Sequence, residues 1–313
     1  MRFGSEPFLG NRPMTGKEFT SEQIAEFWEK HPVGSNFVSA SDWKDFFICY
    51  DCFKYTHEPH ILEEIGKIDF KGKRVLEIGM GQGAEAQKII EAGAIYNGID
   101  LTQESVARVK LRCELFSLPY ESLQVMNAER LDFPDESFDI VFSHGVLHHS
   151  PRIRIIIREI HRVLREGGLV VVMLYHRNSI NYQISIRCLR RLGIVLLFFP
   201  GMSKLVAKLT HENIERLERH LYYLRRDGLA YLKMENFIHK ATDGPDNVFS
   251  SVFSQSEAAE LFSEFKNLSF SKHFLNERHL PILRSLLSAN MKNKIASRYG
   301  WHLWIKGTKP CSR

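Results

Sequence analysis

Residues 74–83 constrain the fold of this chain more than any other stretch. Their first half is apolar enough for a short buried strand, and their second half alternates three glycines, Gly79, Gly81 and Gly83. A helical pattern begins directly afterwards at Ala84. Glycine lets a backbone approach a ligand closely and adopt positive φ, and the first turn of a helix leaves N–H groups unpaired. This order of elements predicts a nucleotide-like cofactor at the carboxyl end of the strand.

Further strands are predicted along the chain, most of them separated by helices. We expect them at 95–100, 123–126, 138–143, 169–175, 267–274 and 301–306, with helices at 102–116, 151–164 and 281–297. Strands that alternate with helices pair in parallel. The expected fold is therefore α/β, with a doubly wound, mainly parallel, Rossmann-like sheet of seven strands.

Four regions are expected from this pattern. Residues 1–70 form an N-terminal arm and an aromatic-rich helical lid, with helices at 21–30, 41–54 and 59–65; residues 71–178 form the α/β core; residues 179–266 form a helical cap; and residues 267–313 add the final strands. A cap inserted before the last two strands would lie over the carboxyl edge of the sheet, where ligands of doubly wound folds bind.

Composition indicates an ordinary globular protein of 313 residues with a net charge of +5. Five scattered cysteines do not resemble a disulfide framework, so a reducing, cytoplasmic location is expected. Cys49 and Cys52 form one C-x-x-C, but no second pair follows, and we expect no metal site. The N-terminus is polar and lacks the apolar segment of a signal peptide.

Several motifs of the core resemble those of class I S-adenosylmethionine-dependent methyltransferases, especially the ubiquinone/menaquinone-biosynthesis-like branch and its natural-product relatives. In chain order they are Val75-Leu76-Glu77-Ile78-Gly79-x-Gly81-x-Gly83, Asp100 at the end of the second strand, 127–139, Val146-Leu147-His148-His149 and Leu164-Arg165-Glu166-Gly167-Gly168. The resemblance is dense over residues 72–178 and thin elsewhere.

The resemblance implies S-adenosyl-L-methionine as the cofactor and S-adenosyl-L-homocysteine as its product. Backbone groups from Gly79 to Gly83 would hold the aminocarboxypropyl part, Glu77 its ammonium group, and Asp100 the ribose hydroxyls. Asn127, where the family often has Asp, would border the adenine with Ala128. The full set of expected cofactor-binding residues is Glu77, Gly79, Gly81, Gly83, Asp100, Leu101, Asn127, Ala128 and Ser143.

Methyl transfer from a sulfonium depends mainly on positioning, and a base helps only when the acceptor must lose a proton. Four candidate catalytic residues lie at carboxyl ends of strands: His148, His149, Tyr175 and His176. Histidine titrates near neutral pH. His176 is the first choice because it opens the expected cap. The paired histidines recur in family members with unlike acceptors, which also fits a structural role.

Two other functions fit part of the pattern. Gly79-x-Gly81-x-x-Ala84 also satisfies the fingerprint of NAD(P)-dependent oxidoreductases, and a non-catalytic cofactor-binding interaction module is the third reading. For a methyltransferase, the expected acceptor is an oxygen or nitrogen atom of a small molecule or peptide natural product. The basic residues alternate with apolar ones, so nucleic acid is not expected. Residues 184–209 could instead contact a membrane surface, or simply pack as a cap helix.

Overall fold

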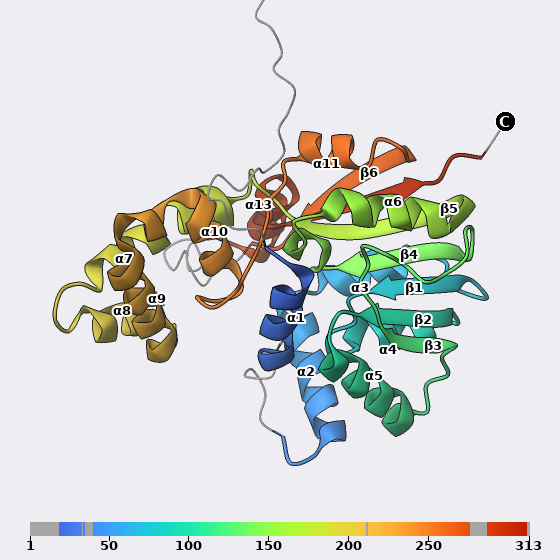
Figure 1. Ribbon diagram of the computed structural model, residues 1–313, viewed down its shortest axis with the longest axis horizontal. Coiled ribbons are helices and arrows are strands. Elements are labelled where there is room, and N and C mark those ends of the chain that lie inside the picture. Colours follow the sequence, from blue (N-terminus) through green and yellow to red (C-terminus); the bar gives the residue numbers. More distant parts are fainter. Residues whose placement is uncertain (1–18, 33, 35–39, 211, 276–286, 312–313) are drawn as a thin grey trace, which may run out of the picture.

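A seven-stranded sheet forms the centre of the molecule, with the strand order β3-β2-β1-β4-β5-β7-β6 (Figure 1). The strands are β1 Arg74–Ile78, β2 Ile95–Asp100, β3 Ser122–Val125, β4 Phe138–His144, β5 Leu164–Tyr175, β6 Lys266–His273 and β7 His302–Thr308. All neighbours pair in parallel except β7, which is antiparallel to both β5 and β6. The computed structural model describes residues 19–32, 34, 40–210, 212–275 and 287–311. The predicted fold class is confirmed.

Helices cover both faces of this sheet. α6 (Ile153–Val163) and α11 (Gln255–Leu261) pack on one face, and α3 (His60–Gly66), α4 (Ala84–Glu91) and α5 (Gln103–Phe116) pack on the other. The sequence of α6 explains its position, because its buried residues recur at helical spacing: Ile153, Ile156, Ile157, Ile160 and Val163. α11 falls within the predicted 179–266 cap but contributes to the core of the sheet.

Two N-terminal helices lie beside the carboxyl edge of the sheet. α1 (Ser21–Lys30) begins with a capping box at Thr20, and α2 (Trp43–His57) is longer at its carboxyl end than the predicted 41–54 helix. Arg112 of α5 anchors α2 through two hydrogen bonds to Asp51, at 2.7 and 2.9 Å. Residues 1–18 of the predicted arm lie outside the described residues.

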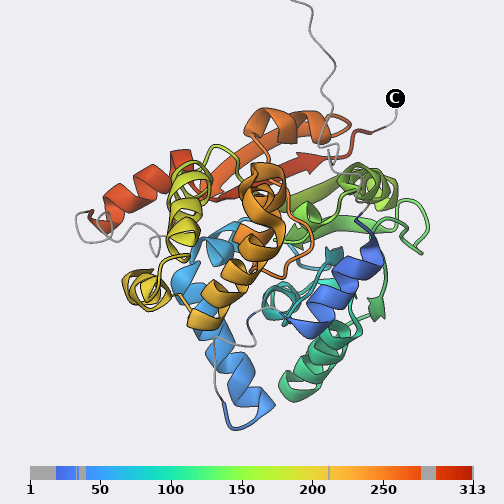
Figure 2. The ribbon, with the colours of Figure 1, turned by 60° about the vertical axis from the view of Figure 1, so that its left-hand side comes forward.

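The cap is a group of helices with a core of its own. It comprises η2 (Asn181–Arg190, a π-helix), α7 (Arg191–Leu196), α8 (Met202–Thr210), α9 (Ile214–Asp227), η3 (Gly228–Leu232) and α10 (Met234–Thr242). In Figures 1 and 2 α7, α8 and α9 project away from the sheet. No helix within the described ranges is long and apolar enough to cross a membrane.

The chain returns from the cap to complete the sheet. A bridge between His176 and Phe253 joins the two ends of the cap, after which β6, α13 (Ala289–Tyr299) and β7 follow. α13 starts later than the predicted 281–297 helix, and residues 276–286 lie outside the described residues. Since β7 pairs directly with β5, its first residue, His302, lies beside Tyr175 at the carboxyl edge of β5.

Candidate functional site

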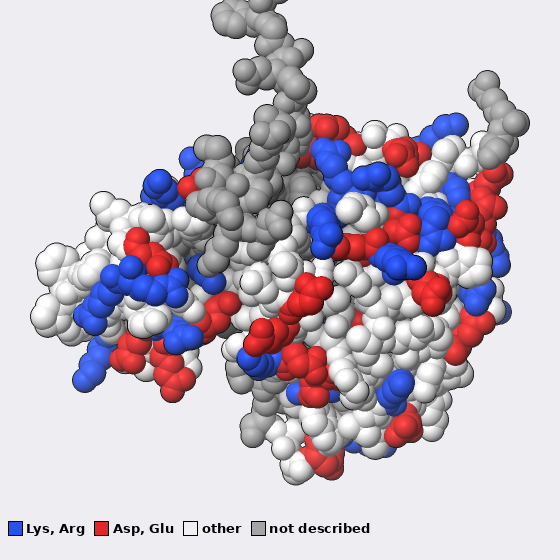
Figure 3. Space-filling model, in the orientation of Figure 1, with Lys and Arg blue, Asp and Glu red and all other residues white. Residues whose placement is uncertain are grey.

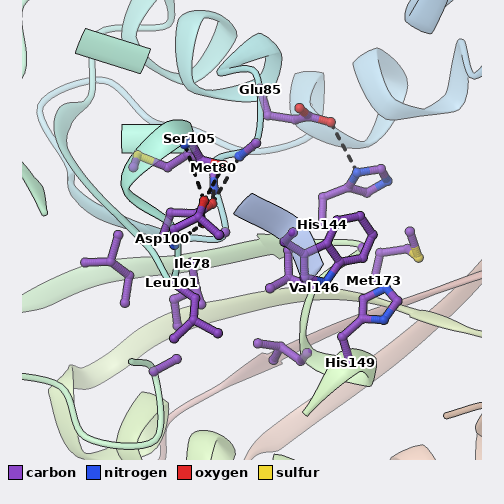
Figure 4. Close-up of a pocket in the computed structure, with 18 of the residues that line it drawn as sticks. Ile78, Met80, Glu85, Asp100, Leu101, Ser105, His144, Val146, His149 and Met173 are labelled. Carbon is purple, nitrogen blue, oxygen red and sulfur yellow. Dashed lines mark hydrogen bonds and ion pairs between the residues drawn. The ribbon is translucent and has the colours of Figure 1, made fainter. Parts of the chain in front are cut away.

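A cavity of about 390 Å³ opens at the carboxyl edge of β1, β2 and β4 (Figure 4). Its volume falls in the range of small-molecule sites, roughly 300–1,000 Å³. The sheet and the loops after its strands form one side, and α1, α2 and the loop after α10 contribute to the rest. Of the thirteen residues predicted to bind cofactor or act in catalysis, eight line it: Gly79, Gly81, Asp100, Leu101, Asn127, Ala128, His149 and Tyr175.

The glycine turn borders the cavity as predicted from its spacing. Gly79 has φ +80°, and a Cβ there would lie only 2.2 Å from a methyl carbon of Val146. Gly81 has φ +52°, and a Cβ there would meet no atom within 4 Å. The first glycine is therefore required by packing and the second leaves room for a ligand. Gly83 caps α4 and packs against Val109, away from the cavity lining.

Asp100 holds the glycine turn against the end of β2. Its Oδ2 accepts hydrogen bonds from the backbone N–H groups of Met80 at 2.9 Å and Gly81 at 3.3 Å (Figure 4). Its Oδ1 accepts from the backbone N–H and the hydroxyl of Thr102, at 3.0 and 2.8 Å. Burial raises the pKa of Asp100, and these hydrogen bonds oppose that shift. A ribose hydroxyl would have to hydrogen-bond the same carboxylate that holds the glycine turn. The hydrogen bond from Gly81 is the longest of the four and would give way most easily.

Two predicted cofactor residues lie inside the sheet domain. The Glu77 carboxyl is buried and accepts a hydrogen bond from the Tyr96 hydroxyl. Burial raises the pKa of Glu77 to about 8, and the nearby Glu85 carboxylate adds to the shift. Ser143 is also buried, and its hydroxyl donates to the carbonyl of Ile78. Both side chains lie on the side of the glycine turn that faces the sheet, and neither lines the cavity.

The residues of the predicted adenine border also line the cavity. Leu101 and Ala128 line it with Asn127, whose Oδ1 accepts a hydrogen bond from the backbone N–H of Glu129 at 2.9 Å. Glu129 in turn accepts a hydrogen bond from the hydroxyl of Ser21 at 3.2 Å. This contact connects the start of α1 to the loop after β3, so the lid helix closes over this border.

Two of the four predicted catalytic residues, His148 and His176, are buried outside the cavity lining. His148 is buried against the ring of Tyr175, with ring centroids 3.7 Å apart, and burial holds its pKa well below the usual range. His176 is buried, and its Nδ1 donates to the carbonyl of Gly300 at 3.0 Å. Burial also lowers the pKa of His176. Neither histidine lines the cavity, because the bridge to Phe253 turns the chain at residue 176 away from it.

The other two candidates form a polar cluster with Asp243 from the cap. The Tyr175 hydroxyl donates to Asp243 Oδ1 at 2.9 Å, and His149 Nε2 lies 3.6 Å from Asp243 Oδ2. His149 Nδ1 lies 2.9 Å from the carbonyl oxygen of Phe249. A carbonyl only accepts, so Nδ1 carries the proton and neutral His149 presents the lone pair of Nε2. Such a nitrogen can take a proton from a group bound in the cavity.

The cavity is also lined by a second cluster of polar residues, which was not predicted from the sequence. Its members come from α2, α4, β4 and β7: Lys54, Glu58, Glu85, His144 and His302. Lys54 pairs with Glu85, and His144 Nδ1 lies 3.2 Å from Glu85 Oε1. Glu85 follows the glycine turn and His144 ends a predicted strand, so position could have suggested these two. Nothing in the sequence connects Glu58 or His302 to them.

The charge of the cavity differs from that of the chain. Five carboxylates line it, and Lys54 is the only lysine or arginine among its described lining residues. The carboxylates belong to Glu58, Glu85, Asp100, Glu129 and Asp243. A surface of this sign attracts cations. The overall charge of +5 therefore says little about the ligand, since basic side chains concentrate elsewhere.

Comparison with known proteins gives the same interpretation of the core. Residues 76–172 match the family model described as "Methyltransferase domain". A phosphatidylethanolamine N-methyltransferase of Cereibacter sphaeroides is 36% identical over 107 residues, which are 34% of this chain and 52% of that protein. A fatty-acid O-methyltransferase of Mycolicibacterium smegmatis is 35% identical over 102 residues, 32% of this chain and 36% of that protein. The chain spans about half or less of the length of these relatives.

Solved structures resemble the whole fold. A possible histamine N-methyltransferase from Thermotoga maritima aligns with 91% of this chain and 99% of its own at 18% identity, with a TM-score of 0.51. A (4+2) cyclase, SpnF, aligns with 94% of this chain and 97% of its own at 15% identity, also with a TM-score of 0.51. Because proteins of different activity share this architecture, the fold is established by these alignments and the reaction is not.

Proposed function

We propose that this chain, whose residues 76–172 match a methyltransferase domain, transfers a methyl group from S-adenosylmethionine to an oxygen or nitrogen atom of an amphiphilic acceptor. The observation that carries the proposal is the cradle between Gly81 and Asp100. There an open glycine turn and a carboxylate at the end of β2 face one cavity. A nicotinamide enzyme could share this cradle, but the matched family model and the relatives favour the methyl donor.

The cavity suits a sulfonium cofactor in its charge and in its polar groups. When bound, S-adenosylmethionine supplies a methyl group whose bond to sulfur breaks as the acceptor bond forms, leaving the electron pair on the sulfur of S-adenosylhomocysteine. Lys54 offers a partner for the cofactor's carboxylate, and Glu85 one for its ammonium group, the role that the sequence analysis gave to Glu77. Asp100 would share its oxygens with the ribose.

His149 is the base that we propose for an acceptor that must lose a proton. Its Nε2 carries the lone pair, lies in the cavity and has the Asp243 carboxylate 3.6 Å away. That carboxylate stabilises the imidazolium that forms when the proton arrives. Asp243 comes from the cap and His149 from the sheet domain, so the cap contributes one member of this pair.

The cap suggests where an amphiphilic acceptor comes from. Residues 184–209 contain five basic residues and no acidic one. Their buried side chains, including Ile186 and Ile194, pack inside the cap. The predicted role as a packed cap helix therefore explains the buried apolar residues of this segment. The other face exposes large apolar side chains: Ile184 45%, Leu189 45%, Leu192 59%, Val195 37%, Phe198 50%, Phe199 60%, Leu205 45% and Leu209 63%.

This surface, which we call the cap tip, has the properties of an interfacial membrane contact. In Figure 3 the lobe that holds α7 and α8 ends in a largely uncharged surface, with both basic and acidic side chains beside it. Apolar side chains enter the headgroup region while Lys and Arg attract anionic lipids. The relatives named above act, by their names, on a phospholipid and on fatty acids. We therefore propose an acceptor that is taken from a membrane surface.

Two experiments test the proposal. The purified chain is incubated with methyl-labelled S-adenosylmethionine and vesicles that contain phosphatidylethanolamine, phosphatidylglycerol or free fatty acid, with Asp100→Ala as the inactive control. Label in the lipid fraction supports the proposal, and label only in water-soluble acceptors contradicts the choice of acceptor.

Membrane contact is tested separately by vesicle sedimentation. We expect binding to phosphatidylglycerol vesicles that Phe198→Glu/Phe199→Glu abolishes and that high salt weakens. Tyr120→Glu is the matched control, since Tyr120 is 42% exposed on the loop before β3, outside the cap. Equal binding by the double variant and the wild type would exclude the cap tip as the membrane contact.

A further inference from the structure

We propose that Glu58, His144 and His302 bind a divalent transition-metal ion in the wall of the cavity. Each offers one ligand atom, and the three atoms all lie within 4.8 Å of one another. The residues come from three elements: the end of α2, the end of β4 and the start of β7. All three side chains line the cavity. The proposal rests on the methyl-transfer function above for its chemistry, but not for its test.

His144 is oriented as a metal ligand. Its side chain is 8% exposed, and its Nδ1 lies 3.2 Å from a carboxylate oxygen of Glu85 (Figure 4). The carboxylate beside it favours the proton on Nδ1, which places the lone pair on Nε2. That Nε2 is buried and has no hydrogen-bond partner in the structure. A buried nitrogen without a partner is costly, and a metal ion would satisfy it.

His302 has a corresponding arrangement on the other side of the cluster. Its Nδ1 lies 2.9 Å from Nε2 of His60, which leaves its own Nε2 for the cavity. The ring of Phe274 packs against it, with centroids 4.7 Å apart. Metal-binding histidines commonly hydrogen-bond through the other ring nitrogen, which fixes the tautomer and the orientation of the ring. Both histidines here have such a partner.

The ligand set selects a class of metal. Two imidazoles and one carboxylate suit Zn²⁺, Fe²⁺ or related ions rather than Mg²⁺ or Ca²⁺. Three protein ligands leave at least one coordination position open, as in catalytic rather than structural zinc sites. Lys54 lies on the preceding turn of α2, and its charge is offset by the ion pair with Glu85. The Glu58 carboxylate therefore offsets the positive charge of the ion.

The open position gives the metal a role in the proposed reaction. An acceptor hydroxyl or amine bound there would have its pKa lowered by the ion, and the released proton could pass to His149. No metal was expected from the sequence because Cys49 and Cys52 have no second pair. Glu58, His144 and His302 are far apart in the chain. Only the placement of β7 next to β5 and the packing of α2 on the sheet domain bring them together.

The test measures metal binding directly, without methyl transfer. The full chain is freed of metal with a chelator and titrated with Zn²⁺ in a calorimeter, and with Co²⁺ while its visible absorption is recorded. We expect one equivalent of each ion to bind. Glu58→Gln and His302→Gln should each weaken binding by at least about tenfold, and Glu85→Gln should weaken it by about 10-fold or more by releasing His144.

His57→Gln is the matched control, because His57 lines the same cavity but lies outside the cluster. It should bind the metal as the wild type does, and all variants should keep the wild-type circular dichroism. The Glu58→Gln, His302→Gln and His57→Gln variants should also keep the wild-type affinity for S-adenosylhomocysteine. Absence of stoichiometric binding by the folded wild type, or equal binding by the Glu58→Gln and wild-type proteins, would overturn the proposal. Loss of S-adenosylhomocysteine binding by the wild type would instead contradict the methyltransferase function.

Discussion

The two sides of the cavity are built in different ways. One side comes from consecutive strand ends within residues 76–172, and the glycine turn and Asp100 lie there. The other side collects residues from α1, α2, the loop after α10 and the start of β7, including Asp243 and His302. The first side lies within the residues that match a family model, whereas Asp243 and His302 of the second side lie outside them.

This difference separates the donor from the acceptor. A cofactor shared by many enzymes needs the same turn and the same carboxylate, so that side is set by local sequence. Acceptors differ between enzymes, and they are bound by helices and loops added around the common sheet. Variants on the first side should therefore affect binding of S-adenosylhomocysteine, and variants on the second should affect turnover.

The largest effect on turnover is expected from His149→Gln, because His149 is the proposed base and pairs with Asp243 of the acceptor side. Loss of a general base typically slows a reaction by about 10²–10⁴-fold, while affinity for S-adenosylhomocysteine should stay within about twofold. His176→Gln is the control, because His176 donates to Gly300 and lies outside the cavity lining. Steady-state kinetics check both variants, and a comparable loss in His176→Gln would remove the distinction between them.

Gly79→Ala should damage the donor side most. The new methyl group would lie 2.2 Å from a carbon of Val146 at a residue with φ +80°, which costs about 3 kcal/mol or more of stability and displaces the turn. Gly167→Ala has a similar φ of +73° and no atom within 4 Å of the new carbon. Thermal unfolding should therefore show only a small loss of stability in Gly167→Ala. Calorimetry should show lost cofactor binding in Gly79→Ala and not in Gly167→Ala.

Asp100→Asn is expected to have a smaller effect on the same side. It keeps the size of the side chain but removes the charge that strengthens the hydrogen bonds from Met80 and Gly81. A charge-assisted hydrogen bond contributes about 1.5–3 kcal/mol, so affinity for S-adenosylhomocysteine should fall by about tenfold or more. The exposed Asp135→Asn serves as the control, and an unchanged affinity in Asp100→Asn would mean that Asp100 serves only the fold.

The smallest effect on binding is expected from Glu77→Gln, although its effect on stability depends on pH. Burial raises the pKa of Glu77 from an ordinary value of 4.5 to about 8. The stabilising effect of its proton is complete below pH 4.5 and is lost as the pH rises through 8. Glutamine stays neutral, so relative to wild type the variant should gain stability between pH 5 and pH 9, by up to about 1.4 kcal/mol per pH unit.

Denaturant unfolding at several pH values measures this gain. Parallel stability curves for Glu77→Gln and the wild type would contradict a protonated Glu77. Calorimetry of the same variant asks whether Glu77 contacts the cofactor, and an affinity within about twofold of wild type supports its placement behind the turn.

The sequence predicted the fold because the fold depends on local patterns, and the same patterns predicted a glycine turn at the carboxyl edge of the sheet. Alternating strands and helices specify a doubly wound sheet, and the spacing of Gly79 and Gly81 specifies the turn. The direction of a side chain is harder to predict. Glu77 belongs to the motif but points to Tyr96, and His176 begins the cap but faces Gly300.

The acceptor side could not be predicted from the sequence, and the reason is a different one. Asp243 meets His149, and His302 meets His144, only through tertiary packing of segments far apart in the chain. No spacing rule connects a loop of the cap with a helix that follows β4. Local patterns therefore identified His149 as a candidate but could not rank it above His176.

The most direct test of this account is calorimetric titration of the whole chain with S-adenosylhomocysteine and, separately, with NAD. The account predicts saturable one-to-one binding of S-adenosylhomocysteine that is lost in Gly79→Ala and retained in His149→Gln, with no binding of NAD. Binding of NAD without binding of S-adenosylhomocysteine would contradict it.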